Sequence, residues 1–290
     1  MNIMKRIKSN TLFILSIAGW LCFSFSSMAQ EDIKLNTTPH ALYERMSNNP
    51  SFKQNAKGEA FCWHARSGMG QFISNYRLPE DTEWLDAAVK YYDFLISKMD
   101  TDPDGYRGWI GPYMYDKNYW IDSHVGDALL IEGMLDFAVL VLEDKQLKKK
   151  YKDKANLYVE IAKKDLVEKN DKRGTWKEDG PIGGYISYSK YMEPGNFKEW
   201  KYGSEVLKSG MSHPFNKQND MATVFIRLYR ITGDKSYFDR AEKIFLRITR
   251  QLQYYDDHYE WNYWEPFGLY DIDLEKRTPV HWIGINPSAR

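Results

Sequence analysis

The chain has 290 residues, with 40 Lys and Arg against 40 Asp and Glu, so its formal charge is zero. This balance gives no electrostatic reason to expect binding to nucleic acid or to an anionic membrane surface. Aromatic residues make up 16% of the chain and include 10 Trp and 21 Tyr. Rings in such numbers favour wide helix–helix packing, a surface that stacks on sugar rings, or both.

Residues 1–29 are typical of a secretory signal peptide. A basic start precedes an apolar stretch over 11–25, and Ser27-Met28-Ala29 resembles a cleavage site. We therefore expect a secreted or periplasmic protein that begins near Gln30, as a single domain over 30–290. It should have no membrane span in the mature chain and, without the three basic residues of the leader, a formal charge near −3.

The spacing of apolar residues predicts several amphipathic helices. In chain order they cover 40–46, 59–76, 82–98, 147–166, 216–232 and 236–252. Gly233 is placed to end the fifth, and Ser236 with Asp239 resembles a capping box at the start of the sixth. The segment 100–121 and the Gly- and Pro-rich segment 169–215 have neither helical nor strand periodicity, and we expect both to be irregular.

The longest apolar stretch, from Val125 to Leu142, predicts a helix that is buried on all sides. Asp122 or Ser123 is expected to be its N-cap. Aromatic and ionisable residues come directly before it, so its start is a candidate binding or catalytic face. An ordinary capped core helix is the alternative. The positive end of this helix should lower the pKa of His124 and keep its imidazole neutral.

Three helical hairpins follow from these helices, over 59–99, 122–168 and 216–252. The second helix of two hairpins opens in a similar way, with an aromatic residue, then Asp, then Ala. The segments that show this repeated pattern are Glu83-Trp84-Leu85-Asp86-Ala87-Ala88, Asn216-Lys217-Gln218-Asn219-Asp220-Met221-Ala222 and Thr232-Gly233-Asp234-Lys235-Ser236-Tyr237-Phe238.

This pattern resembles the six-hairpin (α/α toroid) superfamily of glycoside hydrolases and polysaccharide lyases, over most of 59–252. The resemblance implies an all-α fold of repeated helical hairpins. Three hairpins would make a partial toroid. It also implies a polysaccharide or oligosaccharide substrate. It assigns no site residues, because the complete catalytic signature of no single family is present.

Two chemistries fit the ionisable residues of the loops. Hydrolysis of a glycosidic bond needs two carboxyl groups, and the candidates are Asp122, Asp127, Asp220, Asp256, Asp257, Glu260 and Glu265. Elimination from a uronic acid needs a base and a group that neutralises the substrate carboxylate. A lone carboxylate or His is more often structural, but several of these residues gather at predicted N-terminal helix ends.

We favour elimination, so the expected function is a secreted polysaccharide lyase. A two-carboxylate glycoside hydrolase and a non-catalytic glycan-binding protein are the alternatives. The candidate catalytic residues are His64, Arg66, Tyr119, His124 and His213. The candidate substrate-binding residues are Trp120, Asp122, Tyr185, Asn219, Glu260, Trp261, Trp264 and Glu265. The aromatic segment 254–268 is expected to line the ligand groove. Neither a metal nor another cofactor is expected, and the sequence leaves the oligomeric state open.

Overall fold

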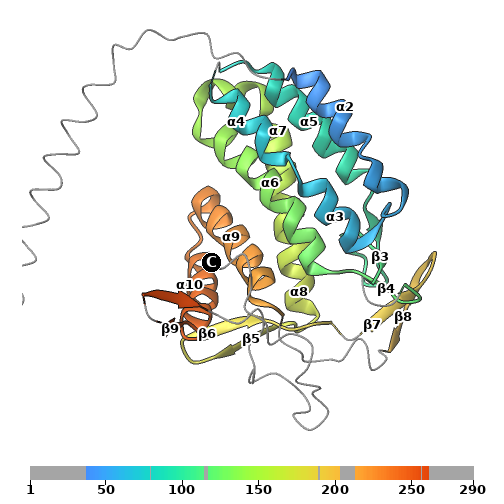
Figure 1. The fold of residues 1–290 in the computed structure, drawn as a ribbon, viewed down its shortest axis with the longest axis vertical. Helices are drawn as coiled ribbons and strands as arrows, with labels where there is room; N and C mark the ends of the chain where they lie inside the picture. The colour runs from blue at the N-terminus through green and yellow to red at the C-terminus, as the bar shows by residue number, and fades with distance from the viewer. Residues whose placement is uncertain are drawn as a thin grey trace, which may run out of the picture. The chain divides into compact units, whose positions relative to one another are not determined.

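The computed structural model describes residues 37–78, 80–113, 117–188, 190–202, 213–255 and 257–260 (Figure 1). All of them belong to one unit of the chain, Thr37–Arg290. The predicted signal peptide lies outside the described residues. No helix in the described ranges combines the length and the apolar character that crossing a membrane requires.

The first part of the unit is helical. It contains α2 (Pro39–Ser47), the short 3-10 helix η1 (Pro50–Lys53), α3 (Gly58–Arg66), α4 (Met69–Tyr76) and α5 (Glu83–Ile96). The helices predicted over 40–46 and 82–98 are confirmed as α2 and α5. The one predicted over 59–76 is two helices, because Gly68 between them has a φ of 96°, a left-handed conformation that a helix cannot contain.

The central helix α6 (His124–Glu143) is confirmed, and its buried residues lie on every side. Figure 1 shows α6 passing between α3 and α9 (Phe215–Thr232), and it also packs against α7 (Lys145–Glu160). Ser123 is its N-cap by position, but the side chain makes no capping hydrogen bond. It donates instead to Glu59 of α3.

The helix after α6 is longer than predicted. From α7 it continues through a π-helix, η2 (Ile161–Glu168), into α8 (Lys169–Lys172). The last hairpin joins α9 to α10 (Lys235–Thr249), and Gly233, with a φ of 73°, ends α9 as predicted. The predicted capping box is wrong, because the side chain of Asp234 caps α10 by accepting from the backbone N–H of Ser236.

The all-α prediction is wrong, and with it the toroid or partial toroid. Antiparallel strands form four small sheets in the described part of the chain. The pairs are β1 (Asp100–Thr101) with β2 (Arg107–Gly108), β5 (Trp176–Asp179) with β6 (Ile182–Tyr185), and β9 (Gln253–Tyr255) with β10 (His258–Glu260). The largest sheet has the order β3 (Gly111–Pro112), β4 (Trp120–Ile121), β7 (Lys190–Glu193), β8 (Asn196–Tyr202). The fold is therefore mixed.

The sheets fall mostly in the two segments predicted to be irregular. Their strands have between two and seven residues, which is too short for a sustained alternation of apolar and polar residues. Tight turns join them, and glycines supply the positive φ that such turns need, 54° at Gly180 and 75° at Gly195. The strands are thus set by turns and by pairing partners, not by local periodicity.

Aromatic rings fill the contact of α5, α6 and α7. The ring centroids of Tyr92 and Phe137 lie 5.9 Å apart, and Tyr158 lies 5.5 Å from Tyr92 and 5.7 Å from Phe137, in edge-to-face arrangements. Such pairs stabilise a core beyond the area that they bury. Part of the aromatic content therefore serves helix packing.

Candidate functional site

The N-terminal ends of α6 and α9 and the end of β6 bring together three residues that the sequence singled out. The ring centroids of His124 and His213 are 4.3 Å apart, with the rings nearly perpendicular. The ring of Tyr185 lies 5.0 Å from that of His124. We call these three residues, with Glu59 and Lys217, the imidazole cluster.

Glu59 of α3 holds the cluster to the neighbouring helices. Its Oε1 accepts from Lys217 Nζ at 2.7 Å and from Trp63 Nε1 at 3.2 Å, and its Oε2 accepts from Ser123 Oγ at 3.0 Å. Burial acts to raise the pKa of Glu59, but the charge of Lys217 and these hydrogen bonds outweigh it, and the pKa is lowered. Glu59 is therefore an ionised carboxylate with both oxygens in use.

The two imidazoles are neutral. Burial is the largest cause that lowers the pKa of His124 well below its usual 6.5, and the charge of Lys217 adds to it. Burial and Lys217 lower the pKa of His213 to about 3. The expected direction of the shift for His124 is confirmed, but its main cause is burial and not the helix end that was predicted. The Nε2 atom of each ring is buried and has no hydrogen-bond partner among the described residues.

The cluster is partly exposed to solvent. His124, Tyr185 and Glu59 are buried, whereas His213, Lys217 and the adjacent Trp63 are partly exposed.

Arg66 lies on α3 two turns after Glu59 and connects acidic groups of α6 and α9. Its guanidinium group donates to Glu132 Oε2 at 3.0 Å and, more weakly, to Asp220 Oδ1 at 3.4 Å. Glu132 also pairs with Arg227 at 3.1 Å, which in turn binds Asp136. These five residues form a charge ladder along the three helices.

Three other predicted site residues lie elsewhere in the described structure. His64 contacts the side chain of Asn55 at 3.3 Å. Tyr119 packs against Tyr191, with ring centroids 4.5 Å apart, and Trp120 lies 5.7 Å from Phe197, so both belong to the surface of the four-stranded sheet.

The remaining predicted residues do not join the imidazole cluster. The side chain of Asn219 is exposed on α9. Glu260 is the last residue of β10, and Trp261, Trp264 and Glu265 lie outside the described residues. The expected groove over 254–268 stays a prediction. In its described part the rings of Tyr254 and Tyr259 are exposed and 5.0 Å apart.

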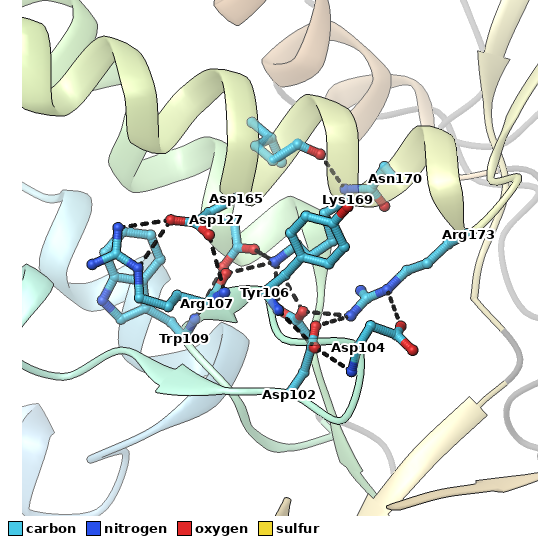
Figure 2. Close-up of polar contacts among 12 residues, drawn as sticks. Asp102, Asp104, Tyr106, Arg107, Trp109, Asp127, Asp165, Lys169, Asn170 and Arg173 are labelled. Carbon is cyan, nitrogen blue, oxygen red and sulfur yellow. Dashed lines mark hydrogen bonds and ion pairs between the residues drawn. The ribbon is translucent and has the colours of Figure 1, made fainter. Parts of the chain in front are cut away.

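Asp122, predicted to bind substrate, belongs to a second buried cluster, of which Figure 2 labels Asp127, Lys169 and Arg173. The ammonium group of Lys169, which has no exposed surface, lies 2.8 Å from Asp122 Oδ2 and 2.6 Å from Asp127 Oδ2, and donates to the carbonyl of Arg107 at 3.0 Å. Arg173 binds Asp122 at 2.9 Å. We call Lys169, Arg173 and their carboxylates the Lys169 cluster.

Arg173 also binds Asp102, which begins the turn before β2. Asp102 Oδ1 accepts from the backbone N–H groups of Asp104 at 2.7 Å and Tyr106 at 3.1 Å. Figure 2 shows how these side chains meet those of α8. The Lys169 cluster therefore ties the β1–β2 turn and the start of α6 to α8.

Burial and charge in the Lys169 cluster shift the pKa values of its carboxyl groups in opposite directions. Burial acts to raise the pKa of Asp122, but Lys169 and Arg173 outweigh it, and the pKa is lowered. Burial raises the pKa of Asp127 in spite of Lys169, and it raises that of Asp102 to about 6 in spite of Arg173. Because the acidic groups are buried and already paired with cations or bonded to backbone N–H groups, this arrangement is structural.

The described residues contain no group of three or more His, Cys, Asp or Glu placed to hold a metal ion. No family model matches this chain, and no curated protein or solved structure gives a significant match. A functional assignment therefore rests on the chemistry of the side chains, and the imidazole cluster is the candidate site.

The neutral imidazoles should make the fold less stable in acid. Because the pKa of His213 is about 3 when folded and ordinarily 6.5, the unfolded chain binds more protons between these values. The free energy of unfolding then falls as the pH is lowered through this range, by up to about 1.4 kcal/mol per pH unit for one group. His213→Gln should reduce this slope, which urea unfolding between neutral and acidic pH measures. An unchanged slope would mean that His213 is protonated in the folded state.

Proposed function

We propose that this protein degrades a uronate-containing polysaccharide by β-elimination, with the imidazole cluster as its catalytic site. The observation that carries this proposal is the pair of neutral imidazoles, 4.3 Å apart, each with a buried Nε2 that has no partner among the described residues. A neutral Nε2 can accept a proton, which is what a general base requires.

The reaction needs two further functions. The carboxylate next to the acidic carbon must be neutralised, because negative charge accumulates there as the proton leaves. Lys217 of α9 and Arg66 of α3 are partly exposed cations. We assign the imidazoles to proton abstraction and these cations to the substrate carboxylate.

The helix ends at the cluster favour an anionic substrate, whereas the charge of Lys217 is already paired with Glu59. Two imidazoles lie at the positive N-terminal ends of α6 and α9, and Lys217 stands beside them. A pKa near 3 makes His213 a weak base in the free protein. A bound carboxylate raises the pKa of a neighbouring imidazole, because it stabilises the imidazolium. A uronate would thus strengthen the base that acts on it, and a neutral sugar would not.

The experiment is an activity panel with the full chain after removal of the leader. Polygalacturonate, alginate and hyaluronan are compared with neutral glycans, and two products are followed. Ultraviolet absorbance reports the unsaturated sugar that only elimination forms, and a reducing-end assay reports cleavage of either kind. Unsaturated product from a uronate glycan supports the proposal. Reducing ends without it would indicate a hydrolase, and binding without cleavage a glycan-binding protein.

A further inference from the structure

Asp220 is a buried carboxyl group with one oxygen unused. It lies on α9 one turn after Lys217 and is 5% exposed. Its Oδ1 has a contact of 3.4 Å with Arg66, and its Oδ2 is buried and has no hydrogen-bond partner among the described residues. A buried polar atom without a partner destabilises the folded state, so its position calls for an explanation.

The surrounding charges leave Asp220 poorly neutralised. The groups that face it are Arg66 from α3, Glu132 from α6 and Lys217 from its own helix. Arg66 is closer to Glu132, at 3.0 Å, and Lys217 is closer to Glu59, at 2.7 Å, so each cation is shared with another carboxylate. Burial raises the pKa of Asp220 to about 6, Arg66 opposes this, and Glu132 adds to it.

Glu59, a buried carboxylate of the imidazole cluster, has the opposite character. Its two oxygens accept from Lys217, Trp63 and Ser123, and its pKa is lowered. When two environments shift the pKa values of two carboxyl groups in opposite directions, the group with the raised pKa is the one that carries a proton. Asp220 is the one that can carry and release a proton.

We infer that Asp220 is the general acid of the elimination and protonates the glycosidic oxygen that leaves. This inference rests on the proposed function. The imidazole takes the proton from the carbon next to the carboxylate, and the electrons of that bond form a double bond to the neighbouring carbon. The bond from that neighbour to the glycosidic oxygen breaks, and its electron pair goes to the oxygen. The oxygen receives the proton of Asp220, and solvent restores the protonation of both groups.

The test is Asp220→Asn, measured on a uronate glycan that the wild type cleaves. The amide keeps the size and polarity of the side chain but cannot deliver a proton. We expect kcat to fall by about two to four orders of magnitude. Because the acid acts in its protonated form, the wild-type rate should fall as the pH rises through about 6. The residual activity of the variant should not show this decrease of rate with rising pH.

Asp136→Asn is the matched control. Asp136 belongs to the same charge ladder through Arg227, but its side chain is 45% exposed and remote from the imidazoles in the ladder; the variant should keep the wild-type rate and pH profile. Asp220→Ser gives a second variant without an acid, should the amide disturb the fold. A folded Asp220 variant with wild-type kcat and the same pH profile overturns the role of Asp220 alone. Absence of unsaturated product from the wild type overturns the proposed function and this role together.

Discussion

Replacing His124 with Gln should lower kcat on a uronate glycan by about two to four orders of magnitude, the usual contribution of an acid–base group. Glutamine can keep a polar contact at the start of α6, but it cannot accept and release a proton. The melting temperature should change little, because the Nε2 atom of His124 makes no hydrogen bond among the described residues that the substitution would break.

His40→Gln is the control, since His40 is exposed on α2. A purely structural role for His124 predicts the reverse pattern, with a lower melting temperature and unchanged turnover of the folded fraction. Steady-state rates and thermal unfolding of both variants distinguish the two roles. Turnover equal to the wild type in a folded His124→Gln protein would remove this residue from the mechanism.

Replacing Lys169 with Met should lower the free energy of unfolding by about 3–5 kcal/mol, because removing one partner of a buried ion pair leaves the other charge without compensation. Here two carboxylates, Asp122 and Asp127, lose the ammonium group that lies within 2.8 Å of both. Urea unfolding at neutral pH measures the loss.

Two further variants separate burial from charge. Lys150→Met breaks an exposed ion pair with Asp86 and should cost less than about 1 kcal/mol. Adding Asp122→Asn to Lys169→Met should recover part of the stability, since the pKa of Asp122 is lowered and its carboxylate is the charge that loses the ammonium group. If Lys169→Met is no more destabilising than Lys150→Met, the ammonium group contributes little net stabilisation to the buried cluster.

The long helices could be predicted because their signal is local. The apolar residues of α5 and α9 repeat every three or four positions, and α6 is apolar on all sides, so each helix is apparent from its own residues. The four-stranded sheet could not be found in this way. Its pairing of Trp120 with Met192 joins residues far apart in the sequence. The Pro194-Gly195 pair before β8 is a local sign of the β7–β8 hairpin.

The site was predicted by residue type more than by position. His124 and His213 were chosen because their chemistry suits catalysis, and Tyr185 was chosen as a substrate-binding residue. The fold brings the three rings together. Glu59 and Lys217 were missed, because their ion pair exists only once α3 packs near the start of α9. Lys169 was missed although a sign was present. The buried stripe of the preceding helix ends at Leu166, and three residues further along the same face is Lys169.

The complete burial of Lys169 makes it a chemical reporter. Amine-reactive reagents modify a lysine only from solvent, so this side chain reacts only in molecules whose contact between α6 and α8 has opened. Its rate of modification then equals the rate for an exposed lysine multiplied by the fraction of open molecules, when closing is faster than reaction. Mass spectrometry of the peptide that contains Lys169 would thus count rare open molecules in native buffer, without denaturant.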